Sequence, residues 1–160
     1  MEKVGIGVDV GGTSIKLGLF QPDGTILKKW EFPTDTSENG THVLPDIADS
    51  IRKTMEETFQ GKAELIGVGI GVPGPVQPTG YVEVGVNLHW REVYPARELS
   101  ELLGGIRVEV GNDANVAALG EAWRGGGEGA ANAVLLTLGT GVGGGVIMNG
   151  EIVTGKHGLA

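Results

Sequence analysis

One pattern occurs twice in the chain and constrains the fold more than any other feature. In the first copy an apolar stretch, Val4 to Val8, runs into Asp9 and the turn Gly11-Gly12-Thr13. In the second copy the apolar stretch 133–138 runs into Gly139-Thr140-Gly141. In both copies a second apolar strand pattern follows, then another turn that ends in glycine, then a third short strand. A strand–turn–strand–turn–strand unit that occurs twice predicts a duplicated fold.

The glycine–threonine turns have the composition of phosphate-binding turns. Glycine has no Cβ, so its backbone N–H can approach an anion closely, and Thr13 adds a hydroxyl donor. Asp9 places a carboxylate where a phosphate-bound Mg²⁺ or its waters would lie, because a hard cation prefers oxygen ligands. Two facing turns would hold a polyphosphate from both sides, although a glycine-rich hairpin with an incidental aspartate has the same local sequence. Lys16 either approaches a phosphate or is a solvated strand residue.

Helix and strand patterns alternate between the two copies. Apolar residues at helical spacing from Leu44 to Phe59 predict an amphipathic helix, and Leu65 to Val72 has the pattern of a strand buried on both faces. A loop is expected from Pro73 to Trp90. Strands are expected at 4–9, 14–20, 25–32, 65–72, 106–110, 133–138, 142–148 and 151–153, with further helices from about Pro95 and at 113–123. This order predicts a mixed sheet flanked by helices, an α/β fold.

Composition and charge exclude several classes of protein. The formal net charge of −8 argues against nucleic acid, which selects basic surfaces, and against anionic membranes. The sequence shows no signal peptide and no apolar run of about 18 residues, so we expect a cytoplasmic protein. With 0 cysteines the chain can form neither a disulfide nor a thiolate metal site, and its 3 histidines are not spaced as metal ligands.

Residues 112–115, Asn-Asp-Ala-Asn, contain the strongest candidate for a catalytic base. Asp113 is expected where a strand ends and a helix begins, and the helix dipole there favours an ionised carboxylate. Such a carboxylate can accept a proton from a substrate hydroxyl. Asn112 and Asp113 are also common N-cap residues, so a structural role stays open, and one residue can serve both roles.

Two further stretches need interpretation. Asn87-Leu88-His89-Trp90 combines an amide, an imidazole and an aromatic ring, as sugar-binding loops do, although a loop tryptophan is also often part of a core. Gly139–Gly144 and Gly69–Gly74 both match the dinucleotide-binding pattern G-x-G-x-x-G, which requires a helix that begins at the glycines. A strand pattern follows the first match and prolines interrupt the second, so we reject both.

Taken together, these stretches resemble the ROK family of bacterial sugar kinases and repressors, and most closely its glucose-phosphorylating members. The matching stretches are Asp9-Val-Gly-Gly-Thr13, Gly71-Val-Pro-Gly74, Asn87-Leu-His-Trp90, Asn112-Asp-Ala-Asn-Val-Ala-Ala-Leu-Gly-Glu121 and Leu138-Gly-Thr-Gly-Val-Gly-Gly-Gly145. They follow the family's order and extend along the chain. The resemblance implies an actin-like, ribonuclease-H-type duplicated fold with ATP in the cleft between two domains.

The resemblance also implies a role for each candidate residue in the phosphorylation of glucose at its 6-hydroxyl. Asp113 would be the catalytic base, and Gly74, Asn87, Asn112 and Asp113 would bind the sugar. The ATP phosphates would be held by Asp9, Gly11, Gly12, Thr13, Lys16, Gly139, Thr140, Gly141 and Gly143, with Mg²⁺ bound to Asp9 through water. Phosphoryl transfer needs mainly positioning and charge stabilisation, which two turns, a metal and one base can supply.

The same resemblance divides the chain into a complete first domain, 1–111, and an incomplete second domain, 112–160. In the family the stretch from Gly155 onward continues into a Gly-Glu-x-Gly-His motif and a cysteine cluster that completes a structural zinc site, and later an adenine pocket. None of these occurs here, so we expect no zinc ligand in this chain and little or no activity from it alone. The family also implies a homodimer.

Three alternatives stay open. The sugar can be another hexose, such as fructose, mannose, N-acetylmannosamine or allose. The protein can be a sugar-binding repressor of the same family, but those carry a DNA-binding domain before the first strand, which here begins at Val4. It can also be an actin-like ATPase of the chaperone or cytoskeletal type, which would share the phosphate turns without needing Asn87, Asn112 or Asp113.

Overall fold

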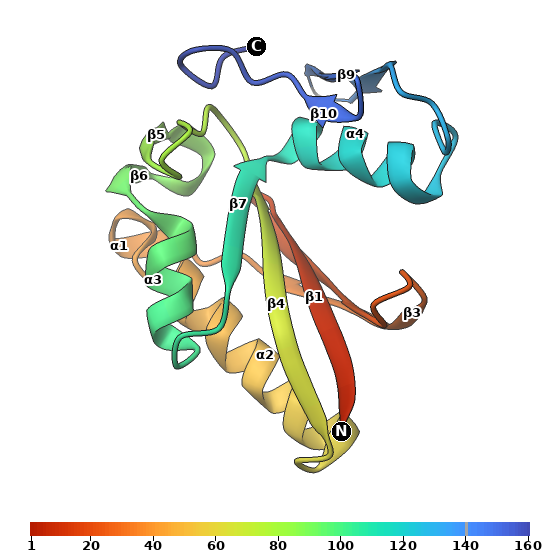
Figure 1. The fold of residues 1–160 in the computed structure, drawn as a ribbon. Helices are drawn as coiled ribbons and strands as arrows, with labels where there is room; N and C mark the ends of the chain where they lie inside the picture. The colour runs from red at the N-terminus through yellow and green to blue at the C-terminus, as the bar shows by residue number, and fades with distance from the viewer. Residues whose placement is uncertain (140) are drawn as a thin grey trace.

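The structure, a computed structural model, describes residues 1–139 and 141–160. These residues form a five-stranded sheet, a three-stranded sheet, a two-stranded hairpin and four α-helices (Figure 1). The strands are β1 (Glu2–Val10), β2 (Ser14–Phe20), β3 (Ile26–Pro33), β4 (Ala63–Val72), β5 (Val82–Gly85), β6 (Trp90–Val93), β7 (Val108–Asn112), β8 (Ala133–Leu138), β9 (Val142–Met148) and β10 (Glu151–Ile152). The helices are α1 (Ser37–Gly40), α2 (Val43–Phe59), α3 (Pro95–Leu102) and α4 (Asp113–Arg124), with a 3-10 turn η1 (Val86–Leu88).

The larger sheet has the strand order β3-β2-β1-β4-β7. Strands β1, β2 and β3 form an antiparallel meander, and β4 and β7 continue the sheet parallel to β1. Parallel strands end at the same edge of a sheet. The ladder accordingly pairs Asp9 with Gly71 and Val72 with Asn112, which places the candidate residues of three strands at one edge.

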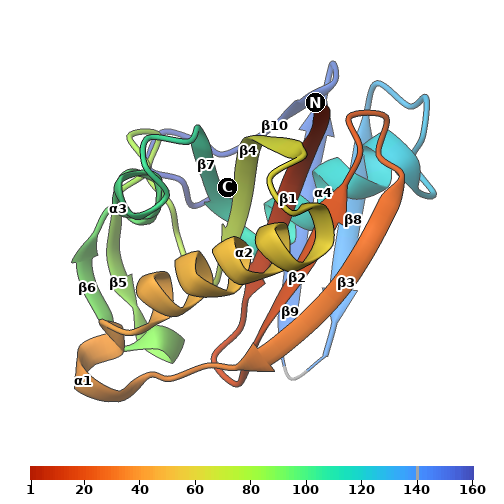
Figure 2. The same cartoon turned by 90° about the horizontal axis from the view of Figure 1, so that it is seen from below.

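The smaller sheet repeats the meander of the larger one. Its order, β10-β9-β8, corresponds to β3-β2-β1, so the duplication expected from the sequence is confirmed in the strand topology. Helix α4 packs against β8 and β9, where Gly145 lies against Ala118. Figure 2 shows the turn after β1 and the end of β8 at the same end of the molecule.

The hydrophobic core lies between the larger sheet and α2, as the amphipathic pattern predicts. Val4, Val10 and Ile15 from the sheet and Ile47 and Ile51 from the helix are at most 1% exposed. Helix α3 packs beside α2 and β7 and begins at Pro95 as expected, since proline is tolerated in the first turn of a helix (Figure 1). This core fixes the sheet whose edge carries the candidate site.

Three expectations for the middle of the chain were wrong in part. Strand β4 is buried on both faces only at its carboxyl end: Val68 and Ile70 face the core, and on the opposite face Gly71 is buried beside Val116 of α4, whereas Gly69 is exposed. The segment expected as a loop contains the hairpin β5–β6 and the turn η1. Strand β7 also begins two residues later than the pattern predicts, at Val108, and extends to Asn112.

Candidate active site

A cavity of about 700 Å³ opens between the edge of the larger sheet and the smaller sheet, beside the first turns of α4. Its polar lining comes from four separate stretches of the sequence: Asp9, Asn87, Asp113 and Thr137. Gly71, Gly141 and Gly143 complete parts of the wall. The sequence predicted most of these residues as a site, and the fold brings them to one place.

The first glycine–threonine turn joins β1 to β2 and is held by internal hydrogen bonds. The Gly11 N–H donates to the Ser14 carbonyl oxygen at 3.0 Å, and the Thr34 hydroxyl donates to the Gly11 carbonyl oxygen at 2.6 Å. Among the described residues, none accepts a hydrogen bond from the N–H of Gly12 or Thr13. The turn therefore has two backbone donors available to an anion. A Cβ at Gly12 would lie 3.1 Å from the Asn87 carbonyl oxygen, so the turn also packs tightly against the Asn87 loop.

Asp9 and Asp113 face the same cavity, and the charge of Asp113 acts on Asp9. Burial raises the pKa of Asp9 above its ordinary value, the negative charge of Asp113 raises that pKa further, and the positive charge of Lys16 opposes both effects. Lys16 is paired directly with Asp9 in the β1–β2 ladder but does not line the cavity. A site with two neighbouring carboxylates favours a proton or a cation between them.

Asn112 is the N-cap of α4, which confirms the structural role that the sequence left open. Its Oδ1 accepts hydrogen bonds from the N–H groups of Ala114 at 3.1 Å and Asn115 at 3.3 Å. Its Nδ2 donates to the Gly74 carbonyl oxygen at 2.8 Å. The side chain thus joins two of the predicted sugar-binding residues and keeps one amide hydrogen for a ligand.

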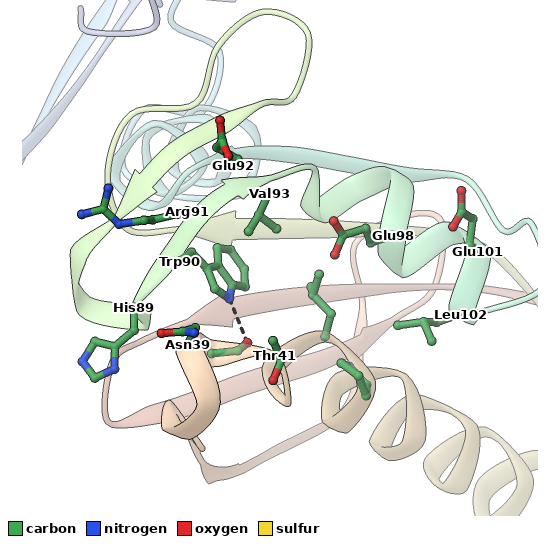
Figure 3. A pocket seen from close by; sticks show the side chains of 13 residues that line it. Asn39, Thr41, His89, Trp90, Arg91, Glu92, Val93, Glu98, Glu101 and Leu102 are labelled. Atoms are coloured by element: carbon green, nitrogen blue, oxygen red, sulfur yellow. Dashed lines mark hydrogen bonds between the residues drawn. The ribbon is translucent and has the colours of Figure 1, made fainter.

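The Asn87–Trp90 segment divides between two cavities. Asn87 lines the cavity of Asp9 and Asp113, whereas His89 and Trp90 line a second cavity of about 780 Å³ beside α1 and α3 (Figure 3). Trp90 is 3% exposed, and its Nε1 donates to the Gly40 carbonyl oxygen at 3.0 Å. Trp90 is therefore a core residue that anchors the loop, which is the structural alternative that the sequence left open.

The second glycine–threonine turn is described by the structure except for residue 140. The Gly139 N–H donates to the Gly141 carbonyl oxygen at 2.9 Å, and Gly141 and Gly143 line the cavity. Thr140, a predicted phosphate ligand, lies outside the described residues. Thr137 was missed by the sequence reasoning, although a lone hydroxyl in the apolar stretch 133–138 was a usable signal.

The residues present fit a magnesium ion better than a fully protein-bound metal. No group of three or more His, Cys, Asp and Glu side chains comes together as a metal site within residues 1–139 and 141–160. Asp9 and Asp113 offer hard oxygen donors, and Mg²⁺ commonly takes one or two carboxylates and completes its shell with water and phosphate oxygens. In the part of the chain that the structure describes, no helix is long and apolar enough to cross a membrane.

The fold and the cavity define an actin-like α/β protein in which two meanders flank a pair of carboxylates. The ROK family model matches residues 5–160, and the chain belongs to the ROK family. It is 45% identical over 156 residues to the glucokinase of Halalkalibacterium halodurans and 42% identical to that of Thermotoga maritima. These matches cover 97% and 96% of the chain and 47% of each relative, so the chain spans about half the length of these relatives.

A solved structure also supports the assignment to the ROK family. The ROK glucokinase of Streptomyces griseus, in complex with glucose and AMPPNP, superimposes with a TM-score of 0.80 at 34% identity. The match covers 98% of this chain and 48% of that one. The resemblance noted in the sequence is confirmed at the level of family and fold.

Proposed function

We propose that the protein phosphorylates a hexose with ATP, that glucose is the preferred sugar, and that the 6-hydroxyl is the acceptor. The observation that carries this proposal is the cavity that Asp9 and Asp113 share. The Gly11–Thr13 turn does not line that cavity, but it packs on Asn87 in the cavity wall and has two N–H groups without partners among the described residues. The names of the glucokinase relatives, and the glucose and AMPPNP bound to the Streptomyces griseus protein, support the choice of substrates.

In this mechanism Asp113 accepts the proton of the sugar hydroxyl as that oxygen attacks the terminal phosphorus of ATP. The bond from that phosphorus to the bridging oxygen breaks, and ADP leaves with the electron pair. Asp113 is the first residue of α4, so its carboxylate lies at the positive end of the helix dipole. The N–H groups of Gly12 and Thr13 would hold phosphate oxygens, and Asp9 would hold Mg²⁺ through water. Bound Mg²⁺ would offset the repulsion between the phosphates and the two carboxylates. The turn from Gly139 to Gly143 would hold the phosphates from the opposite side.

The sugar would be oriented by neutral groups around Asp113. Asn87 lines the cavity directly, and Asn112 fixes the Gly74 carbonyl while one of its amide hydrogens stays available for a hydroxyl.

We also propose the division into units 1–111 and 112–160, because β7 ends at Asn112 and α4 packs on β8 and β9. Homodimer formation stays a prediction.

A panel of sugars tests the substrate assignment. The natural gene product that contains this chain is assayed for ADP release with glucose, fructose, mannose and N-acetylmannosamine, with ATP and Mg²⁺ present. The proposal expects the highest kcat/KM for glucose. A higher kcat/KM for another hexose corrects the sugar. Saturable sugar binding without any ADP release favours the repressor alternative and contradicts the kinase assignment.

A further inference from the structure

Helix α4 is attached to the larger sheet at both of its ends. At its start β7 runs directly into the helix, and Asn112 binds the Gly74 carbonyl oxygen at 2.8 Å. At its far end the helix meets the turn between β2 and β3, as Figure 2 shows. Between the two ends, a cavity of about 480 Å³ is lined by Trp123 and by glycines of β1 and β4, so the far end of the helix does not rest on the face of the sheet. The turn is therefore the second attachment.

The second attachment consists of a hydrogen bond and a ring contact. Arg124 Nη2 donates to the Asp23 carbonyl oxygen. A Cβ at Gly24 would come within 2.9 Å of Trp123 Cη2, so only glycine lets the indole ring lie this close to the turn. The Arg124 Cζ lies over the same ring, 5.5 Å from its centroid. The two side chains therefore hold the turn together, as one contact.

This contact joins the two proposed units of the fold. Asp23 and Gly24 belong to the first unit, whereas α4 belongs to the second, because it packs on β8 and β9. Trp123 and the Arg124 side chain are 55% and 52% exposed, so the contact adds little to the stability of the chain. Its consequence is geometric. Attachments at both ends of a helix of 12 residues, about 18 Å long, fix the direction of the helix axis, whereas a single attachment would let the helix pivot.

The direction of α4 bears on the candidate active site. The smaller sheet moves with the helix, because Gly145 of β9 packs directly on Ala118. Gly143 lines the candidate active site from the smaller sheet, and Asp9 lines it from the larger one. A rotation of α4 about its start would therefore change the distance between Asp9 and the second glycine–threonine turn. Asp113 lies at the pivot and would move least.

We propose that the contact of Trp123 and Arg124 with the turn 22–24 sets the orientation of the smaller sheet, and that Arg124 is a positioning residue for the second phosphate-type turn. Without its hydrogen bond the chain populates further orientations of α4, and ATP binds only the fraction in which both turns reach its phosphates. The consequence for ATP rests on the proposed function. The orientation of the two units does not.

Arg124→Met tests the orientation directly. The chain has 0 cysteines, so spin labels attached at Lys53→Cys in the first unit and Glu151→Cys in the second report only the distance between the units. Pulsed electron spin resonance should give a broader distance distribution in Arg124→Met than in the labelled parent.

Arg52→Met is the matched control. The Arg52 side chain is 51% exposed and also donates to a distant backbone carbonyl, that of Leu102, but both partners lie within the first unit. This variant should leave the distribution unchanged. An unchanged distribution in Arg124→Met, or equal broadening in Arg52→Met, overturns the proposal whether or not the protein is a kinase.

Kinetics of the natural gene product test the consequence for ATP. Arg124→Met should raise the KM for ATP about threefold to tenfold, because the penalty cannot exceed the free energy of the lost bond. The KM for the sugar should stay within about twofold, because the predicted sugar contacts lie in the first unit and at the pivot. Arg124→Lys keeps a cationic donor and should restore most of the loss. Asp23→Asn keeps the backbone carbonyl and should resemble the wild type.

The outcomes separate this inference from the proposed function. An unchanged KM for ATP in Arg124→Met, or an equal rise in Arg52→Met, overturns the positioning role. Absence of turnover in the wild type contradicts the proposed function instead, and the label distances then support or overturn the inference by themselves.

Discussion

Asp9 lies near the end of β1 and Asp113 at the start of α4, and the fold brings these two distant carboxylates to one cavity. Both residues could be predicted as site residues, because each comes at the end of an apolar strand pattern. Asp9 precedes a phosphate-type turn, and Asp113 is placed as a possible catalytic base. The raised pKa of Asp9 could not be predicted, because it arises from burial and from a charge that only the folded chain brings near. Trp90 shows the reverse case: its residue type suggested a ligand contact, and its burial makes it part of the core.

The raised pKa of Asp9 predicts that Asp9→Asn stabilises the chain at pH 7. A carboxyl whose pKa is higher in the folded state than in the unfolded state costs stability once pH exceeds the folded-state pKa. The gain should stay below about 1 kcal/mol because the side chain is open to solvent on one side, which screens its interactions. It should disappear in urea denaturation near pH 3, below the ordinary pKa of 3.8, where both states hold the proton.

Glu64→Gln is the matched control for this experiment. Glu64 is an exposed carboxylate on β4, outside the cavity, and its removal should change stability by less than about 0.5 kcal/mol. A loss of stability in Asp9→Asn at pH 7 would contradict the described interaction between the two carboxylates.

At the scale of elements, helices and strands with a strong periodic pattern could be predicted from the sequence, whereas short irregular elements could not. The meander strands and α2 follow from alternation and helical spacing, and α4 follows from the Asn-Asp cap. Helix α1 and the strands β5 and β6 are each four residues long. Elements this short show no hydrophobic periodicity that could be recognised in the sequence. Their positions depend on long-range contacts such as the hydrogen bond from Trp90 to Gly40.

That contact predicts that Trp90→Phe destabilises the chain by about 1–3 kcal/mol. The variant keeps an aromatic ring but leaves the buried carbonyl of Gly40 without its donor. The change is measured by thermal and urea denaturation. Trp123→Phe is the control, because Trp123 is 55% exposed, and its effect should stay within about 0.5 kcal/mol. Equal effects of the two substitutions would show that the Trp90 bond contributes nothing.

The double role of Asn112 predicts different results for two substitutions. Asn112→Ala removes both the cap of α4 and the bond to Gly74, and should cost about 1–2 kcal/mol. Asn112→Ser keeps a capping oxygen but is too short to reach Gly74, so it should cost less. Urea denaturation gives both values. If the serine variant is as unstable as the alanine variant, the capping role is refuted.

At the scale of the whole molecule, the duplicated meander accounts for the two phosphate-type turns. The second turn lines the cavity with Gly141 and Gly143, and the first packs on Asn87 in the cavity wall. The repeat could be read from the sequence because its glycines and threonines recur in order. The separation of Asn87 from His89 and Trp90 could not be predicted, because it depends on the left-handed backbone of His89 (φ 59°) between η1 and β6.

The most direct measurement follows glucose phosphorylation by ³¹P NMR in the natural gene product that contains this chain, with and without Asp113→Asn. The wild-type protein should form glucose 6-phosphate from ATP and Mg²⁺. The variant should lose about 10²–10⁴-fold in kcat, as expected for removal of a general base, while its unfolding temperature stays close to that of the wild type. Retention of full kcat by the variant would contradict the role of Asp113, and absence of any sugar-dependent turnover in the wild type would contradict the proposed activity itself.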